Sequence, residues 1–199
     1  MNRRDVEVVF AHHQTEGEGR FGRKWHSERG RSLTFSIALS EYGNHPKPWQ
    51  IGMGVAVVCA ELLDCSLRWP NDLDIEGNKV GGLLTQLRDP NRIPVIGIGV
   101  NLRSVAVSPE SQPSVGSIES HVNPLSLAES ICGAIASEDF HDWEGTLRRW
   151  RSRDNTKGKQ YRTVTGEQIV GERIGDDGEL ITDSGSTVLA ADALWGQND

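Results

Sequence analysis

Cysteine is scarce in this chain of 199 residues. Its three cysteines, Cys59, Cys65 and Cys132, are odd in number and include no CxxC pair. They therefore indicate neither a disulfide framework nor a zinc site. We expect reduced thiols in the core of a cytoplasmic protein.

A long apolar segment is also missing. The longest such run, residues 51–63, is interrupted by Gly52, Gly54 and Glu61, and it is shorter than the roughly 20 residues that cross a bilayer. The amino-terminal residues contain no apolar core of signal-peptide length. We expect a protein that has no membrane segment and is not secreted.

Positive charge is in deficit. Lysine and arginine total 21 against 28 aspartates and glutamates, which gives a net charge of −7 at pH 7. Such a chain as a whole has no attraction for polyanions, so a nucleic-acid role would need a local basic patch. The length and the 36% hydrophobic content fit one globular domain with a small appendage.

Hydrophobic periodicity predicts an α+β fold. Strands are expected at residues 5–11, 32–39, 67–69, 80–87 and 95–102, and helices at 48–63, 125–136 and 140–151. The proline- and serine-containing segment 104–120 predicts a long surface loop. After a polar stretch at 153–158, short β-prone pieces separated by glycines predict a small barrel. These pieces are residues 161–164, 169–174, 179–182 and 187–189.

Residues 14–25, QTEGEGRFGRKW, combine glycines, cations and an aromatic residue. Glycines let a backbone approach a ligand, and arginine forks bind carboxylate or phosphate. The spacing is not that of a Walker A loop, and the GxGxxG match of Gly17, Gly19 and Gly22 lacks the strand-to-helix setting. Taken alone, the segment is more simply a solvated basic turn.

A second polar segment changes that interpretation. Residues 68–73, RWPNDL, place two oxygen-bearing side chains, Asn71 and Asp72, shortly before Lys79, which follows Asp72 by seven residues. Such oxygens suit Mg²⁺ or a ribose, and a lone lysine suits a developing negative charge. The apolar run 95–102, VIGIGVNL, carries polar Asn101 near its end, which indicates a pocket at a strand end.

Together these segments resemble the biotin protein ligase family. QTEGEGRFGRKW is similar to the family's biotin-binding loop, QTxGRGRxGRxW; RWPNDLDIEGNKVGGLL resembles its KWPND…K…GIL segment, and VIGIGVNL its GIGxN landmark. The order and spacing of the three agree, and the stretch from Gly158 to Trp195 is similar to the family's SH3-like domain. The resemblance implies a mixed β-sheet packed with helices in residues 1–153, followed by a small SH3-like β-barrel in residues 154–199.

The resemblance also implies an activity. Members form biotinyl-5'-AMP from the substrates biotin and ATP with Mg²⁺, and transfer biotin to a lysine of a biotin carboxyl carrier protein or of the carrier domain of a carboxylase. Carried over by position, Lys79 and Arg20 are the expected catalytic residues. The residues expected to bind biotin are Gln14, Glu18, Gly19, Arg20 and Lys79. Those expected at the nucleotide are Arg23, Trp25, Asn71, Asp72 and Asn101, with Asp72 also as a ligand of Mg²⁺.

Two features depart from the family pattern. Glu18 stands where the first arginine of GRGR is usual, which puts an anion beside the expected phosphates. The family's Ser-Thr-Asn segment, which precedes the loop, has no counterpart before Asp5. Either the natural start lies upstream or part of the biotin site is missing. Some relatives carry an amino-terminal helix-turn-helix domain, for which there is no room here, so we expect no specific DNA binding. Some relatives pair through sheet edges, which keeps a homodimer among the expectations.

Three other functions stay open. A lipoate or octanoate transferase shares the superfamily and its central lysine. A non-catalytic biotin- or adenylate-binding protein would fit Glu18 and the missing segment. An RNA-binding module could use the arginine-rich loop, although the acidic balance argues against it. His12 and His13 lack further metal-ligand spacing, and Trp143 and Trp150 at helical spacing are expected in the core.

Overall fold

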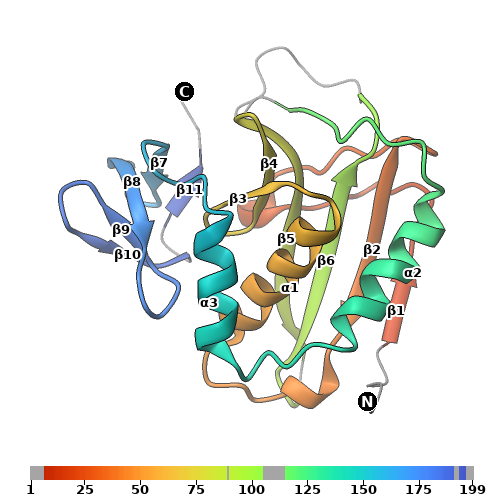
Figure 1. Cartoon of the computed structure of the whole chain (residues 1–199), viewed down its shortest axis with the longest axis horizontal. Coiled ribbons are helices and arrows are strands. Elements are labelled where there is room, and N and C mark those ends of the chain that lie inside the picture. The colour runs from red at the N-terminus through yellow and green to blue at the C-terminus, as the bar shows by residue number, and fades with distance from the viewer. Residues whose placement is uncertain (1–6, 89, 105–114, 191–192, 196–199) are drawn as a thin grey trace.

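The computed structural model contains a six-stranded sheet with helices on one face (Figure 1). A second, smaller sheet lies beside it. The structure describes residues 7–88, 90–104, 115–190 and 193–195. The expected α+β class is confirmed. Within these residues, no helix is long and apolar enough to cross a membrane.

The large sheet has the strand order β1-β2-β6-β5-β4-β3, and each neighbouring pair of these strands is antiparallel. Its strands are β1 (Glu7–Phe10), β2 (Ser32–Ala38), β3 (Ser66–Arg68), β4 (Asp72–Ile75), β5 (Asn78–Arg88) and β6 (Ile93–Asn101). The expected strands are all present. β4 was not expected, because its alternate residues Asp72 and Asp74 are charged and, for a strand, unusually buried.

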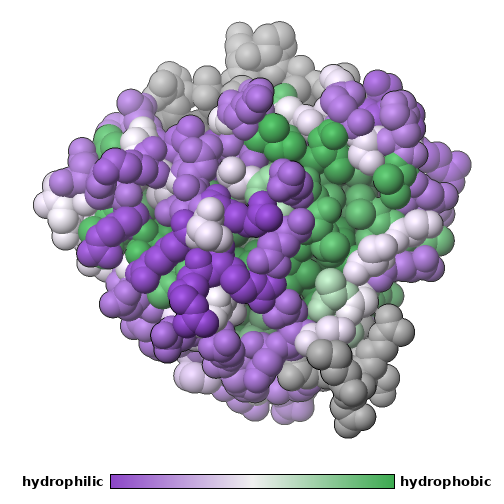
Figure 2. Space-filling model, in the orientation of Figure 1, coloured by the Kyte–Doolittle hydropathy of each residue, from purple (hydrophilic) through white to green (hydrophobic). Residues whose placement is uncertain are grey.

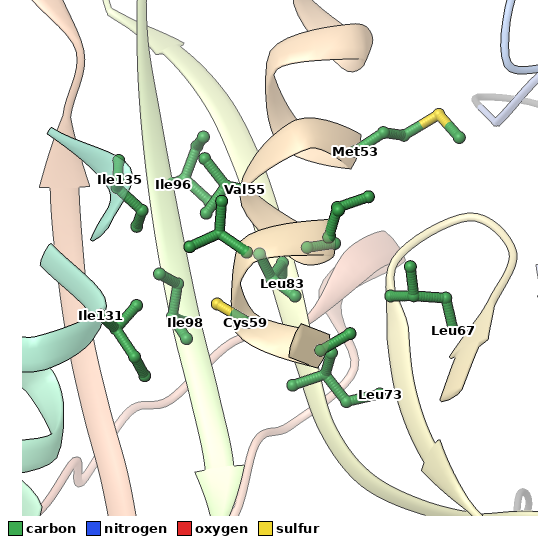
Figure 3. Close-up of a cluster of buried hydrophobic side chains, with 14 of the residues drawn as sticks. Met53, Val55, Cys59, Leu67, Leu73, Leu83, Ile96, Ile98, Ile131 and Ile135 are labelled. Carbon is green, nitrogen blue, oxygen red and sulfur yellow. The ribbon is translucent and has the colours of Figure 1, made fainter. Parts of the chain in front are cut away.

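The helices cover one face of this sheet. They are α1 (Pro48–Leu62), α2 (Pro124–Ile135) and α3 (Trp143–Ser152). Figure 3 shows side chains of α1, α2 and β6 meeting in the core, among them Val55, Cys59, Ile96, Ile98 and Ile131. All of these are at most 3% exposed. Burial of this apolar face drives the packing.

Small residues bring α1 close to the sheet and to its neighbours. A Cβ atom placed on Gly52 would lie 2.2 Å from Oγ1 of Thr85 on β5, and one on Gly54 would lie 2.4 Å from the Phe140 ring. The glycines of this apolar run therefore serve close packing. In the same orientation, Figure 2 shows hydrophilic residues over the area of α3 and a group of hydrophobic residues between α3 and the outer side of α2.

The second sheet has the order β10-β9-β8-β7-β11, and the pairs β10–β9, β9–β8, β8–β7 and β7–β11 are antiparallel. Its strands are β7 (Gln160–Thr163), β8 (Gln168–Ile174), β9 (Leu180–Thr182), β10 (Thr187–Val188) and β11 (Ala193–Trp195). The short β-prone pieces are confirmed as strands, and β11 is an additional one. A division of the chain into domains 1–153 and 154–199 stays a prediction.

Three tryptophans, two in helices α1 and α3 and one between β3 and β4, bind one turn of the small sheet. The turn of residues 176–178 connects β8 to β9. Its three successive carbonyl oxygens accept hydrogen bonds from the indoles of Trp143 (2.6 Å), Trp49 (2.9 Å) and Trp69 (2.9 Å). We call Trp49, Trp69 and Trp143 the tryptophan cluster. Because each indole N–H has a partner in the turn, the two sheets are docked at a fixed place.

Two further expectations concern single segments. Within the expected loop 104–120, residues 105–114 lie outside the described part. Residues 115–118 are bonded to the large sheet rather than solvated, because the Gly116 amide donates to the Lys79 carbonyl (2.9 Å) and the Ile118 amide to that of Asn101 (2.9 Å). Of the two tryptophans expected in the core, Trp150 is fully buried there, whereas Trp143 is only partly buried and packs against it.

A substitution at Gly178 tests the docking. Gly178 has φ +88°, and a Cβ there would lie 2.8 Å from Met53 Sδ and 3.2 Å from the Trp143 ring. Left-handed backbone costs a non-glycine residue roughly 1–2 kcal/mol, and crowding adds about 1–3 kcal/mol. Gly178→Ala should therefore lower the free energy of unfolding in urea by more than Gly185→Ala. Gly185 has a similar φ of +84°, with no described atom within 4 Å of a Cβ. Equal losses would contradict close docking.

Candidate functional site

The glycine-rich segment folds into a short hairpin. The Gly19 amide donates to the Arg23 carbonyl and the Trp25 amide to the Gly17 carbonyl, both at 2.7 Å. A 3-10 turn, η1 (Arg20–Gly22), forms its tip and places Phe21 at φ 57°. The segment thus has a defined shape, rather than being a solvated turn.

A cavity of about 530 Å³ lies between this hairpin and the face of the large sheet that the helices leave free. This volume is within the range of small-molecule sites. The predicted site residues that line it are Gln14, Glu18, Gly19, Arg20, Arg23, Trp25, Asn71, Lys79 and Asn101. The structure therefore brings nine of the ten together, counting each residue once. Asp72 is not among the lining residues.

Glycines form the floor of the cavity. Gly97 and Gly99 are alternate residues of β6, and Gly82 lies opposite Gly99 on β5. A Cβ atom on Gly99 would lie 2.5 Å from the Trp25 indole ring, so the indole packs directly on the strand backbone. These floor residues were not predicted, although the period-two spacing of Gly97, Gly99 and Asn101 was a signal for them.

Other lining residues were also missed. They are Glu16, Lys24, His26, Phe35, Ser36, Leu83, Leu84, Gln86, Val95, Ile98 and Val115. Ser36 of β2 and Leu84 of β5 both pair with Gly97, which places them beside the floor. Neither belongs to a polar motif, so only the strand register reveals them.

Lys79 stands at the cavity wall, paired with a buried carboxylate. Its Nζ lies 2.5 Å from Oδ1 of Asp72, and the two side chains are 18% and 5% exposed. A Cβ on Gly82 would lie 3.1 Å from Lys79 Nζ, so this glycine makes room for the pair. The register between β4 and β5 shifts between Leu73 and Asp74. Such irregularities commonly re-aim side chains beside active sites.

This setting shifts the pKa of Lys79. Burial lowers the pKa of its ammonium group from the usual value, and Asp72 opposes that shift by attraction and hydrogen bonding, while Arg23 and Arg68 add to it. A cation that is held but poorly solvated interacts strongly with any anion that enters the cavity. Lys79 is thus placed to receive a carboxylate or phosphate.

Arg20 supplies a second cation from the hairpin tip. Its guanidinium donates to the carbonyl of Ala190, which follows β10 of the small sheet, and lies 4.9 Å from the centre of the Phe21 ring. Burial, with a smaller contribution from Arg23, lowers the pKa of Arg20 to about 10 against the attraction of Asp72. Arg20 therefore remains charged near neutral pH and links the hairpin to the small sheet.

Two polar atoms at the cavity are buried without a hydrogen-bond partner among the described residues: Nε1 of Trp25 and Oδ1 of Asn101. The Asn101 amide nitrogen is engaged, because it donates to the Gly116 carbonyl at 3.0 Å. Buried polar groups without partners are costly. One donor and one acceptor in a cavity wall are therefore available to a bound molecule.

Asn71 and Asp72 lie differently from each other. Asn71 is bonded to β5 through both its side chain, which donates to the Leu83 carbonyl, and its own carbonyl, which accepts from the Leu83 amide at 2.9 Å. Asp72 lies behind Lys79, with its second oxygen 3.6 Å from Arg68. Their expected contacts with the nucleotide and with Mg²⁺ stay predictions.

The described residues do not form a metal site by themselves. No three of their histidine, cysteine, aspartate and glutamate side chains are grouped so as to hold an ion, and the Asp72 carboxylate is already shared by Lys79 and Arg68. A magnesium ion fits this site only as part of a phosphate-bearing ligand, since Mg²⁺ is often bound by one carboxylate together with phosphates.

The fold is that of solved biotin protein ligases. The enzyme of Aquifex aeolicus in complex with biotin and ATP matches with a TM-score of 0.74 at 21% identity, over 96% of this chain and 89% of that one. The enzyme of Leishmania major in complex with biotin matches with a TM-score of 0.66 at 19% identity, over 97% and 89%.

Sequence comparison gives the family. The biotin/lipoate A/B protein ligase family matches residues 3–102, and the chain belongs to that family. It is 27% identical to the biotin–[acetyl-CoA-carboxylase] ligase of Mycobacterium tuberculosis over an alignment of 215 positions, gaps included. The alignment covers 95% of this chain and 77% of that protein. It is 34% identical to the bifunctional ligase/repressor BirA of Bacillus subtilis over 104 residues, 48% of this chain and 32% of that protein. The chain thus spans about a third of the length of that relative.

Gly99→Ala tests whether the indole rests on the cavity floor. The added methyl would overlap the Trp25 ring, so Trp25 must move. In a ¹H–¹⁵N spectrum, the indole signal of Trp25, assigned with Trp25→Phe, should shift strongly in this variant. Gly97→Ala is the matched control on the same strand, because its Cβ would meet only ordinary contacts at 3.8–3.9 Å. Similar shifts in the two variants would count against the described floor.

Proposed function

We propose that this chain is a biotin protein ligase that forms biotinyl-5'-AMP from biotin and ATP and transfers biotin to a lysine of a carrier protein. The observation that carries the proposal is the partly buried Lys79, paired with the buried Asp72 at the wall of a cavity that Arg20 of the hairpin also lines. The named relatives support the choice of biotin among the acids that this family activates.

The chemistry needs these cations. In the first step, the biotin carboxylate attacks the α-phosphate of ATP, so an oxygen–phosphorus bond forms and pyrophosphate leaves. Two anions must approach each other, and charge spreads over the phosphate oxygens. Lys79 and Arg20, with Arg23 beside them, would offset the repulsion and stabilise that charge. Mg²⁺ would enter with ATP as part of the substrate.

The remaining wall suits the two molecules. Apolar residues Phe35, Leu84 and Val95 line the cavity and can bury the aliphatic chain and ring carbons of biotin. The Asn101 acceptor fits an N–H donor such as the amino group of adenine, and the Trp25 N–H fits a carbonyl or phosphate oxygen. With these assignments the nucleotide would lie near Asn101, a position that stays a prediction.

The hairpin would also protect the intermediate. An acyl adenylate is hydrolysed readily, and a structured loop over it excludes water until the carrier lysine attacks. In that second step, the lysine nitrogen bonds to the biotin carbonyl carbon, and AMP leaves. The expected partner remains a biotin carboxyl carrier protein or the carrier domain of a carboxylase, and a homodimer remains an expectation.

Biotin-dependent exchange of pyrophosphate into ATP tests the proposal. The intact chain should show exchange with biotin and not with lipoate or octanoate. Lys79→Ala should lower the rate by at least about a hundredfold, the scale of removing one group that stabilises transition-state charge. Lys157→Ala, which removes a lysine from a surface ion pair with Glu172, is the matched control. Biotin binding without exchange would favour the binding-only alternative, and exchange with lipoate or octanoate alone would favour the transferase.

Glu18 gives a second test. It is exposed at the cavity edge, in the hairpin strand that faces Lys24. Because Glu18→Arg changes the local charge by two units, it should lower the KM for ATP roughly threefold, the scale of an exposed ionic contact. Glu129→Arg makes the same change on α2, on the other face of the sheet. An unchanged or raised KM in the first variant would show that Glu18 does not face the phosphates.

A further inference from the structure

Arg68 is the most deeply buried cationic side chain near the cavity. It ends β3, and its side chain is 0% exposed. Its Nη1 lies 2.8 Å from Oδ2 of Asp74, and its Nη2 lies 3.6 Å from Oδ2 of Asp72. Arg68 therefore joins two carboxylates that would otherwise repel each other in the protein interior.

The hairpin of β3 and β4 holds these groups opposite one another. In its register, Arg68 faces Asp72, and Leu67 faces Leu73. Both leucines are fully buried and project into the core (Figure 3). Because side chains alternate along a strand, anchoring the leucines on one face fixes Arg68 and Asp72 on the other.

Asp72 divides its two oxygens between two cations. Oδ1 pairs with Lys79 Nζ at 2.5 Å, whereas Oδ2 is directed to Arg68. Arg68, Asp72, Asp74 and Lys79 together carry two positive and two negative charges, and the first three are at most 5% exposed. Such a neutral set can remain charged away from water, because each charge has a partner of opposite sign.

The set is tied to the segment that follows α3. Oδ1 of Asp74 accepts hydrogen bonds from the Gly77 amide (2.8 Å) and from Nδ2 of Asn155 (2.9 Å). The backbone N–H of Asn155 in turn donates to the Leu67 carbonyl at 2.7 Å. Both oxygens of Asp74 are thus engaged, and its ion pair with Arg68 keeps the guanidinium 3.6 Å from Asp72. The other oxygen of Asp72 can then form the shorter contact with Lys79.

We propose that Arg68 is a positioning residue, which fixes the Asp72 carboxylate so that Asp72 holds the Lys79 ammonium group at the cavity wall. This inference rests on the proposed ligase function for its effect on catalysis. Without Arg68, Asp72 and Asp74 would repel, the Asp72 carboxylate would turn, and Lys79 would lose its fixed position. Positioning errors of this kind lower the rate of the chemical step more than they weaken substrate binding.

Arg68→Met and Arg68→Lys are the test variants. In Arg68→Met, kcat for biotin-dependent exchange should fall at least about tenfold while the KM for biotin changes less than about threefold, the pattern of a lost transition-state interaction. Arg68→Lys keeps the charge but cannot reach two carboxylates as a fork does, so it should recover part of kcat. Arg149→Met is the matched control, because Arg149 also joins two carboxylates, those of Glu61 and Glu138, away from the cavity.

A chemical readout separates this inference from the ligase function. Acetylation of Lys79 by acetic anhydride, followed by mass spectrometry with the exposed Lys157 as an internal reference, reports how firmly its ammonium group is held. Arg68→Lys keeps the positive charge that lowers the pKa of Lys79 but not the fork that holds Asp72, so it should raise the relative rate several-fold, and Arg149→Lys should leave it unchanged. If Arg68→Lys does not fold, Asp74→Asn, which keeps the shape but removes the anchor of Arg68, should give a smaller change in the same direction.

The outcomes are distinct. Unchanged kcat and unchanged Lys79 acetylation in folded Arg68 or Asp74 variants would overturn the positioning role. A fall in kcat that Arg149→Met matches would also overturn it, since loss of an ordinary ion-pair cluster would then explain the effect. If the intact chain shows no exchange but Lys79 acetylation responds as described, the positioning role stands and the ligase proposal fails.

Discussion

The burial of paired charges beneath the cavity is the constraint on which the site depends. A lysine at the wall of a protein cavity keeps its charge only if a carboxylate compensates for lost solvent, and that carboxylate must itself be held. Here the compensation extends from Lys79 through Asp72 and Arg68 to Asp74. It draws on β3, β4, β5 and the segment after α3, so the position of one ammonium group depends on contacts between elements far apart in the sequence.

The cavity needs a second condition, which is a bare floor. The sheet presents large apolar side chains to the helices and glycines to the hairpin, so the same strand β6 contributes Ile96 to the core and Gly99 to the site. Trp25 can then lie on the backbone itself. The hairpin approaches β6 closely at Gly99 because no side chain projects there, and the cations of the loop line the same cavity as Lys79.

Much of this arrangement could be predicted from the sequence, because local patterns carry it. Alternation and helical spacing predicted most of the helices and strands, and three polar segments predicted nine of the 23 residues that line the cavity. β4 was missed because aspartates are rare in buried strands. Asp72 and Asp74 can be buried there only because Arg68 pairs with both, and the sequence does not show that contact. The floor was missed because Gly97 and Gly99 fit an ordinary buried strand, and only the packing of helices on one side shows which face stays open. The meeting of Trp49, Trp69 and Trp143 at one turn depends on the tertiary fold alone.

The tryptophan cluster also provides an intrinsic fluorescence probe of the contact between the two sheets. Three of the six indoles lie where the two sheets meet, each bonded to a carbonyl of one turn, and a fourth, that of Trp25, lies at the cavity. Indole emission depends on the polarity around the ring. Separation of the sheets would therefore change the intrinsic fluorescence of half the tryptophans at once, while a ligand in the cavity would change that of Trp25. The two events would therefore have different effects on the emission spectrum of the unlabelled protein.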